Sequence, residues 1–286
     1  MMLSALAAVI LHAGRLTTNT DTTVTVPPGT RLQVENFGGS ITVTAWSKDA
    51  VRIAAEHSAR NEITVENDGS LLRVSARGRR GPPLTCDFTI TVPRWMDLRL
   101  SGVYTDASIE GVESEVRVET VRGDVSLVGG KGFASLRSVE GEVTAKNVNG
   151  RVEAGSVNEG IHLEGIKGEI KAETVNGDIA LEGIESDAVE ASTVNGDICF
   201  RGAVRDAGHY SFGTHGGDIT LALPGSPNAT IAASTFNGEF ESEFNAKLIE
   251  HRKGRYRLTL GSGTADVSVE SFEGTIRIGT SDEKCK

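Results

Sequence analysis

Acidic residues recur at a fixed place in a repeated phrase of this sequence. The hexapeptide TVNGDI occurs twice, at Thr174–Ile179 and Thr193–Ile198, and in each copy an aspartate follows the glycine. Calcium prefers a shell of several oxygen ligands, which carboxylates stacked at regular intervals would supply. Equivalent positions along the chain hold Asp106, Asp124, Glu142, Asp178, Asp197, Asp218 and Glu239. The candidate metal ligands in this series are Asp124, Glu142, Asp178, Asp197 and Asp218.

A structural role accounts for the same residues. An acidic side chain after glycine suits a turn, because its carboxylate accepts hydrogen bonds from nearby backbone N–H groups. The GGxGxDxUx signature of calcium-binding β-rolls does not occur in the chain. We therefore favour turn capping and keep a calcium-binding edge as the alternative. Just before the glycines, Asn158, Asn176 and Asn195 predict a stacked ladder of amide side chains.

The elements that position these residues follow a nine-residue repeat. From Leu98 to Ala203 the chain contains twelve consecutive units with apolar residues at positions 1, 3 and 6, and one residue is inserted in the unit that begins at Ile179. Positions 1 and 3 alternate as in a strand, so both side chains point to one face. Positions 7–9 are polar and rich in glycine, which predicts a turn that ends in the acid. The residues at position 6, including Val175 and Val194, are predicted to lie in the core.

Strands this short cannot bury their apolar face alone, but stacked copies can, which is the principle of a solenoid. The stronger similarity has a period of eighteen residues, as between the Thr-Val pairs that precede the Gly-Asp turns. We predict an all-β, parallel β-helix whose coils of about 18 residues consist of two nine-residue halves. Neighbouring strands would pair in parallel about 4.8 Å apart. Right-handed coiling is the usual sense of parallel crossovers.

The repeat is less regular towards both ends of the chain. Residues 50–92 interrupt the period and predict antiparallel hairpins, with Asn67-Asp68-Gly69 as a tight turn. Such a region would cover the open end of the tube, where unpaired backbone invites aggregation. The predicted organisation is a leader at 1–20, an N-terminal β region and cap at 21–97, the regular solenoid at 98–206, irregular coils at 207–280 and a tail at 281–286.

Three features carry a resemblance to a known family. They are the serial [Thr/Ser]-Val-x-Gly-[Asp/Glu]-[Val/Ile] turns, the Val-Pro entry at Val92–Leu100 and the VENFGGSITVTAW opening at Val34–Trp46. Over roughly residues 20–280 the chain resembles the DUF4097 family of bacterial β-solenoid proteins, which carry the label "putative adhesin". The resemblance implies a parallel β-helix, an exported or envelope-associated location and no established enzyme activity. It supplies no catalytic residues.

Other groups of residues could also do chemistry. His209, His215 and Asp218 lie close in sequence and suit a metal or acid–base site. His215, however, occupies position 6, an inward position of the repeat, which favours a core or turn histidine. The basic run Arg73–Gly81 suits a solvated hairpin tip, with anionic lipid or glycan phosphate as the alternative ligand. The three cysteines show neither CxxC spacing nor the density of a disulfide framework, and Cys86 alternates with apolar residues as a buried residue does.

Charge and the N-terminus bear on partners and location. The net charge of −10 is concentrated in residues 101–200, which carry 8 basic and 19 acidic side chains, so nucleic acid is excluded as a partner. An apolar run from Leu3 to Leu11 resembles the core of a secretory signal peptide, with Ala13 as a cleavage point, and is too short to span a bilayer. No other segment of the sequence predicts a transmembrane span. We expect an extracytoplasmic protein, in the periplasm or at the cell surface.

These observations favour a non-enzymatic, exported protein of the bacterial cell envelope that acts as a structural or adhesin-like interaction module. Its partner would be an envelope protein or a glycan, and no cofactor is expected apart from calcium in the alternative hypothesis. One competing hypothesis is a carbohydrate-active β-helix enzyme that uses paired carboxylates such as Asp178 and Asp197. It is disfavoured because the middle coils lack aromatic platforms for sugars. The other is a calcium-stabilised scaffold. The sequence does not define the oligomeric state.

Overall fold

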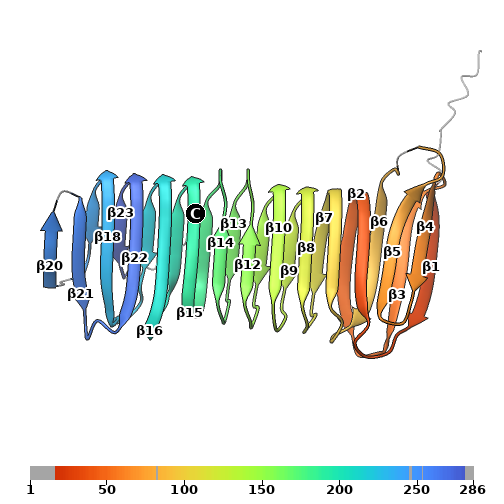
Figure 1. Cartoon of the computed structure of the whole chain (residues 1–286), viewed down its shortest axis with the longest axis horizontal. Coiled ribbons are helices and arrows are strands. Elements are labelled where there is room, and N and C mark those ends of the chain that lie inside the picture. The colour runs from red at the N-terminus through yellow and green to blue at the C-terminus, as the bar shows by residue number, and fades with distance from the viewer. Residues whose placement is uncertain (1–16, 82, 245–246, 253, 281–286) are drawn as a thin grey trace, which may run out of the picture.

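The protein is a long tube built from strands (Figure 1). The computed structural model describes residues 17–81, 83–244, 247–252 and 254–280, and every regular element in these ranges is a strand. The prediction of an all-β fold is therefore confirmed. The predicted signal segment and the tail at 281–286 lie outside the described residues, except that β1 (Thr17–Thr25) begins inside the range assigned to the leader.

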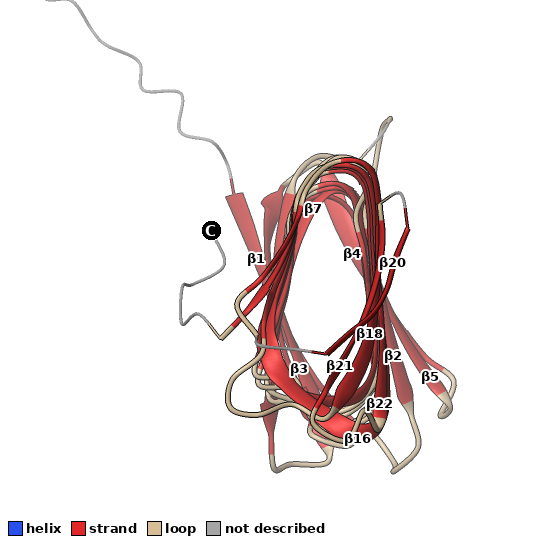
Figure 2. Cartoon of the chain, turned by 90° about the vertical axis from the view of Figure 1, so that its left-hand side faces the viewer, coloured by secondary structure: helices blue, strands red, loops and turns tan. Residues whose placement is uncertain are grey.

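Two walls form the tube, as the end-on view in Figure 2 shows. The strands β2, β7, β15 and β16 bend from one wall into the other, so all 23 strands belong to one hydrogen-bonded network. Wall 1 consists, in spatial order, of β4 (Asn61–Asn67), β5 (Leu71–Gly78), β2 (Arg31–Trp46), β7 (Leu98–Glu110), β8 (Val116–Arg122), β10 (Ala134–Glu140), β12 (Val152–Gly155), β14 (Ile170–Glu173), β15 (Ile179–Asn195), β16 (Ile198–Gly216), β22 (Ala265–Glu273), β18 (Ala229–Asn237), β21 (Arg255–Leu260) and β20 (Lys247–Arg252). Wall 2 consists of β1, β3 (Ala50–Ser58), β6 (Cys86–Pro93), β2, β7, β9 (Val125–Val128), β11 (Val143–Lys146), β13 (Ile161–Glu164), β15, β16, β17 (Ile219–Ala222), β23 (Ile276–Gly279) and β19 (Phe240–Ser242).

The middle strands pair in parallel, in a register that follows the sequence repeat. Ala134 lies opposite Val116 on one side and Val152 on the other, eighteen residues before and after it. Ile170 lies opposite Val189, nineteen residues later, because the inserted residue falls between them. Each strand therefore presents the same repeat positions to its neighbours, and equivalent residues form columns along the tube.

The core consists of the side chains at positions 1 and 3 of both walls. Val116, Val118, Val125 and Leu127 are at most 2% exposed, and the same holds for most of their equivalents. Burying an aliphatic side chain of this size stabilises the fold by roughly 1.5–3 kcal/mol. Towards the C-terminal end aromatic side chains fill a wider interior, with the rings of Phe200 and Phe212 5.1 Å apart.

Position 6 behaves differently at the two edges of the tube. The chain passes from wall 1 to wall 2 through turns such as 121–124 and 175–178, which we call the acidic edge, and it returns through the opposite edge. At the opposite edge position 6 is buried, as predicted, in Val112, Val148, Ile166 and Ile184. At the acidic edge it is exposed: Val175 is 40% and Val194 is 43% exposed. The prediction that these two valines lie in the core is wrong.

The residue at position 5 causes this difference. At the opposite edge position 5 holds Gly or Asn with a positive φ, and this left-handed residue rotates the chain so that position 6 turns inward. These residues are Gly111, Gly129, Asn147, Gly165 and Gly183. At the acidic edge position 5 holds Thr or Ser in extended conformation. Strand alternation then continues, so the hydroxyl side chain points inward and the valine after it points outward.

Antiparallel pairing is found at the N-terminal end. β4 and β5 form a hairpin around Asn67-Asp68-Gly69, where Gly69 has a φ of +91°, and β3 pairs in antiparallel with both β1 and β6. The predicted hairpin and its turn are confirmed. The basic run does not form the tip of this hairpin, because Arg73 and Arg77 belong to strand β5 and lie on the outer surface of wall 1.

The C-terminal coils are stacked out of chain order. After β16 and β17 the chain skips one place to form β18 and β19, continues through the β20–β21 hairpin and then returns. The returning segment, β22 and β23, is inserted between β16–β17 and β18–β19, in parallel register with both. β18 therefore pairs only with strands that follow it in the sequence.

Candidate functional site

Buried hydroxyl groups organise the acidic edge. The Oγ1 of Thr193 donates to the carbonyl oxygen of Gly177 in the neighbouring coil, at 3.0 Å, and the Oγ of Ser138 donates to Gly123 O at 2.9 Å. Equivalent bonds are made by Thr120, Ser156, Thr174, Thr214, Thr235 and Ser271. These hydroxyls satisfy carbonyl groups that the turn takes out of the strand ladder, which explains why the phrase begins with Thr or Ser.

The glycine of the phrase permits the coils to approach closely. A Cβ atom at Gly141 would overlap the carbonyl oxygen of Gly123, and one at Gly196 would overlap that of Gly177. A side chain at this position would therefore push neighbouring coils apart and stretch the parallel ladder.

The aspartates bind the backbone of the neighbouring coil. Oδ1 of Asp178 accepts a hydrogen bond from the N–H of Asp197 at 2.8 Å, and Oδ1 of Asp197 accepts one from the N–H of Asp218 at 2.8 Å. Asp106 and Asp124 make the same bond to Asp124 and Glu142. The series continues out of chain order, because Asp218 accepts from Thr275 N of the inserted coil at 2.8 Å. One oxygen of each of these aspartates thus caps a backbone group that lacks another partner.

Asp218 has an additional partner in Arg277, whose Nη1 lies 2.8 Å from Oδ2. Partial burial opposes ionisation of Asp218, but the Thr275 N–H and the Arg277 guanidinium together outweigh it and lower the pKa of this carboxyl. Asp218 is therefore charged over a wider pH range than a free aspartate.

The five candidate metal ligands form a column, not a cluster. Asp124 and Glu142 lie in adjacent coils, as do Asp178 and Asp197, and Gly160 separates the two pairs. Within the described ranges, no group of three or more His, Cys, Asp or Glu side chains is arranged to hold a metal ion. Capping uses one oxygen of each aspartate in the column, and in Asp218 the other oxygen pairs with Arg277.

An amide ladder runs beside the carboxylates. Nδ2 of Asn176 donates to Oδ1 of Asn158 at 3.2 Å, and Nδ2 of Asn195 donates to Oδ1 of Asn176 at 2.9 Å. The predicted stack of asparagine side chains is confirmed. Such a ladder fixes the register of neighbouring coils without using charge.

An exposed apolar column follows the same edge, and the sequence analysis missed it. The five valines at position 6 are 37–46% exposed, and aromatic residues continue the line at the C-terminal end. We call this set the apolar column: Val121, Val139, Val157, Val175, Val194, Phe272 and Phe236, with the exposed His215 between Val194 and Phe272. The alternation of positions 1, 3 and 5 was the signal that could have revealed it.

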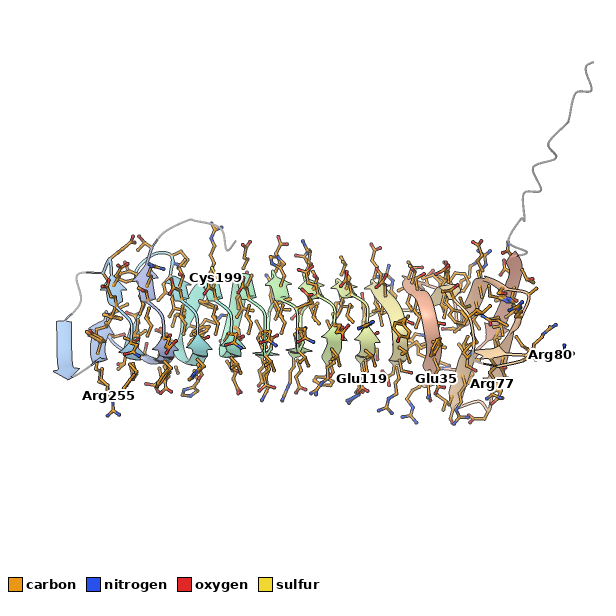
Figure 3. The ribbon with its side chains drawn as sticks, turned by 90° about the horizontal axis from the view of Figure 1, so that it is seen from above. Glu35, Arg77, Arg80, Glu119, Cys199 and Arg255 are labelled. Carbon is orange, nitrogen blue, oxygen red and sulfur yellow. The ribbon has the colours of Figure 1, made fainter. Side chains whose placement is uncertain are left out.

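A groove lies across wall 1 at the C-terminal end, next to the last residues of the apolar column. Three adjoining hollows form this groove, and we call them together the terminal groove. The middle hollow shares Ala232, Arg257 and Ser268 with one neighbour and Ser234, Arg255 and Glu270 with the other. The hollow beside Phe236 and Phe272 has a volume of about 750 Å³. Figure 3 shows Arg255 on the same side of the tube as Glu119, and Cys199 on the other side. The sequence analysis did not predict this groove.

The two histidines of the candidate site, His209 and His215, lie at different places on the tube. His209 lies on wall 1 opposite Asp266, with Nδ1 3.8 Å from the carboxylate, and both side chains are largely exposed. His215 is exposed at the acidic edge, where its ring stacks on Phe272 at 4.7 Å. Of the core and turn positions considered for His215, the core is therefore wrong, because it follows a Thr at position 5 as the valines do.

The cysteines differ in state. Cys86 is free and fully buried, as predicted, and burial raises the pKa of its thiol to about 12. Cys199 is disulfide-bonded, which the sequence analysis did not anticipate from spacing alone. The remaining cysteine of the sequence, Cys285, lies outside the described residues.

The turn with its inward hydroxyl, close-packed glycine and capping acid recurs through both the middle and the C-terminal coils. Residues 153–279 match the Toastrack DUF4097 family model. The resemblance to DUF4097 is thereby confirmed for this part of the chain. The match does not extend over residues 20–152, which the resemblance also included. Toastrack is a β-solenoid-like fold, in agreement with the tube described above.

Several solved structures resemble the whole chain at low identity. A "putative adhesin" from Parabacteroides distasonis is 11% identical, covers 91% of this chain and 97% of its own, and has a TM-score of 0.50. A "putative adhesin" from Bacteroides fragilis is 14% identical, with coverages of 91% and 97% and a TM-score of 0.45. A "putative lipid binding protein" from Parabacteroides distasonis is 10% identical, with coverages of 94% and 97% and a TM-score of 0.34. The first likeness shows a similar fold and nothing further. No curated protein matches the chain.

Proposed function

We propose that this Toastrack protein is a non-enzymatic, exported module of the cell envelope that binds its partner through repeated weak contacts, in the manner of an adhesin. The observation that carries this proposal is the apolar column. Soluble monomers rarely expose long contiguous apolar surfaces, and those that do generally use them for binding. Here valines about 40% exposed stand on successive coils. A partner that contacts several of them gains affinity from their number.

The acidic edge supports a binding role over an enzymatic one. Glycoside hydrolysis needs two carboxylates that face a substrate across a groove. Asp178 and Asp197, the pair considered for this role, stack in one column and each caps a backbone N–H group. Charged side chains of the middle coils also pair along the tube, as Lys146 with Glu164 at 2.9 Å and Lys167 with Glu185 at 3.2 Å. These carboxylates serve the assembly of coils.

Three observations support export. The apolar run at Leu3–Leu11 resembles a signal peptide. Cys199 is disulfide-bonded, and such bonds persist in oxidising compartments outside the cytoplasm. The likeness to a structure described as a "putative adhesin" agrees with an extracytoplasmic location. In addition, the described part of the chain contains no helix long and apolar enough to cross a membrane.

We also propose the length and handedness of the coils and the division of the chain. Coils of about 18 residues with two nine-residue halves and a right-handed sense agree with the parallel registers and with the usual handedness of parallel crossovers. The division into a cap at 21–97, a regular solenoid at 98–206 and irregular coils at 207–280 agrees with the antiparallel pairs β1–β3, β3–β6 and β4–β5 in the first part and with the inserted coil in the last. Experimental coordinates of the whole chain would check both statements.

Binding of purified protein to isolated envelopes tests the function. A triple variant, Val139→Asp, Val157→Asp and Val175→Asp, places charges on the apolar column without touching the core. We expect its co-sedimentation with envelopes to fall at least about tenfold, because several equivalent contacts are lost together. The matched control carries Ser126→Asp, Thr144→Asp and His162→Asp on the outer surface of wall 2 and should bind as the wild type does. Equal binding by both variants would refute the role of the column.

The mature N-terminus and the thiol content test export. We expect mass spectrometry of protein from the cell envelope to show a chain that begins after the apolar run. Alkylation of the denatured, unreduced protein should label Cys86 and leave Cys199 unlabelled. A chain that keeps its first residues, together with a labelled Cys199, would contradict export.

A further inference from the structure

A stack of three rings ends the apolar column at the C-terminal end of the tube. His215 stacks on Phe272 with ring centroids 4.7 Å apart and an interplanar angle of 10°, and Phe272 stacks on Phe236 at 4.9 Å and 7°. Phe236 is nevertheless 73% exposed. Since Phe272 covers one face of its ring, the other face is open to solvent and points along the tube axis, away from the inserted coil.

Hydrogen-bonding groups lie next to this open ring, on the outer surface of wall 1. Ser234 on β18 stands opposite Glu270 of β22 on one side and opposite Arg255 of β21 on the other. All three line the same hollow as Phe236 and Phe272. Strands are spaced by about 4.8 Å, so Glu270 and Arg255 are about 10 Å apart at their backbones, with only the small serine between them. Arg255 lies on the side to which the open face of Phe236 points.

Two of the three arginines that line this groove, Arg255 and Arg257, have no acidic partner among the described side chains, whereas the third, Arg151, pairs with Glu153 and Glu169. Arg205 and Arg277, elsewhere on the tube, each pair with two carboxylates. Arg255 and Arg257 make no ion pair or hydrogen bond through their side chains with any described residue, although Glu270 lines the same hollow as both. A planar guanidinium without a partner is well suited to bind a carboxylate with two parallel hydrogen bonds.

We propose that the terminal groove binds an acidic polysaccharide built from uronate sugars. One pyranose ring stacks its apolar face on the open face of Phe236, its carboxylate pairs with Arg255, and its hydroxyl groups hydrogen-bond Ser234 and Glu270. The chain of the polysaccharide continues along wall 1 towards Arg257 and Ser268. The inference rests on the proposed binding function and names the chemical class of the partner.

The shape and chemistry of the groove favour a sugar over other ligands. A flat aromatic face in an open, polar hollow suits a pyranose ring, which has an apolar face and a rim of hydroxyl groups. An apolar peptide side chain would need an enclosed pocket, whereas this hollow is a shallow part of the surface. The negative net charge of the chain disfavours duplex nucleic acid, which carries one charge for about every 1.7 Å of its axis.

Calorimetric titration of the full chain with a hexamer of α-1,4-linked galacturonate tests the proposal, with a neutral galactose hexamer of the same linkage as the comparison ligand. We expect binding of the acidic hexamer that weakens with added salt, and at least about tenfold weaker binding of the neutral one. Phe236→Ala should weaken binding of the acidic hexamer about tenfold, and Arg255→Gln should weaken it about fivefold and remove most of the salt dependence. The controls Tyr104→Ala and Arg99→Gln change an exposed aromatic residue and an exposed arginine far from the groove and should bind as the wild type does.

The outcomes separate this proposal from the general function. If neither hexamer binds, or if Phe236→Ala and Arg255→Gln bind like their controls, the glycan site is refuted. A concentration-dependent dimer in sedimentation that Phe236→Ala dissociates would also refute it, because the ring would then contact a second copy of the chain. If envelope binding still depends on Val139, Val157 and Val175 in that case, the module function stands and only the glycan assignment fails. Thermal unfolding of each variant checks that it is folded.

Discussion

The carboxylate of Asp178 accepts a hydrogen bond from the backbone N–H of Asp197, the equivalent aspartate of the next coil, at 2.8 Å. The acid of each turn therefore holds the following coil in place, and the repeat that suggested a metal-binding edge is explained by the assembly of the backbone. Substitution of Asp178 tests whether this hydrogen bond stabilises the fold.

Asp178→Ala should lower the free energy of unfolding by about 1–2 kcal/mol, because the N–H of Asp197 loses its acceptor. Asp178→Asn should cost less, since its amide oxygen can accept the same bond. Urea unfolding followed by circular dichroism measures both, and addition of EDTA should leave the wild-type midpoint unchanged. An Asn variant as unstable as the Ala variant, or a midpoint lowered by EDTA, would favour a charged or cation-bound edge instead.

Gly196 and Gly213 should respond in opposite ways to substitution by alanine. A Cβ at Gly196 would overlap Gly177 O, whereas one at Gly213 would meet nothing within 4 Å. Gly196→Ala should destabilise the protein by about 3 kcal/mol or more. Gly213→Ala should be neutral or stabilising by up to about 1 kcal/mol, because alanine restricts the unfolded chain. Similar melting temperatures for the two variants would argue against the close packing of the acidic edge.

The pair Thr193 and Val194 tests the inversion of polarity at the same edge. Thr193→Val keeps the shape of the side chain but leaves Gly177 O without its partner, and it should cost about 1–2 kcal/mol. Val194→Thr replaces an exposed side chain and should change the stability by less than about 0.5 kcal/mol. Chemical denaturation of both single variants is the measurement. If Thr193→Val left the stability unchanged and Val194→Thr lowered it, the result would instead indicate that Val194 is buried and Thr193 is exposed.

Asp218 gives the stability a defined pH dependence. Its pKa is lowered in the folded protein, so its stabilising contribution is complete above the pKa of the unfolded chain, about 4, and is lost as the pH falls through the lower folded value. The side chain is 39% exposed, so solvent screening limits this contribution to less than about 1 kcal/mol. Asp218→Asn should therefore melt below the wild type at pH 7 and approach it below about pH 2.

The substitution Arg277→Gln is the control for that experiment. It removes one of the groups that lower the pKa of Asp218, so the acid-induced loss of stability should begin at a higher pH than in the wild type. Unfolding midpoints measured in steps from pH 7 to pH 2 would show the shift. A constant difference between Asp218→Asn and the wild type over this range would contradict the linkage.

The sequence was sufficient to predict the tube but not the direction of every side chain. Positions 1 and 3 of each unit, such as Val116 and Val118, follow a period of two, and this alternation alone places them inside. Val112 and Val121 occupy the same repeat position, yet only Val112 is buried, because Gly111 before it adopts a left-handed conformation and Thr120 does not. The residue type at position 5, Gly or Asn at one edge and Thr or Ser at the other, is the signal that distinguishes buried from exposed residues at position 6.

The terminal groove was beyond the reach of the sequence for a different reason. The residues of its hollow beside Phe236 and Phe272 come from β16, β18, β21 and β22, and they become neighbours only because β22 is inserted between β16 and β18. A repeat that stacks in chain order gives no indication of this exchange. The acidic series shows the same effect, since Asp218 is followed in space by Thr275 and not by residue 239.

The inserted coil also constrains the order in which the C-terminal end of the tube can fold. A solenoid that grows one coil at a time can be stable at any length, but here β18 has no partner until residues 255–273 have been made. This end of the tube can therefore close only after residues 255–273 have left the ribosome. A chain that stops before residue 265 would expose the unpaired backbone of β16 and β18 together, and such edges invite aggregation.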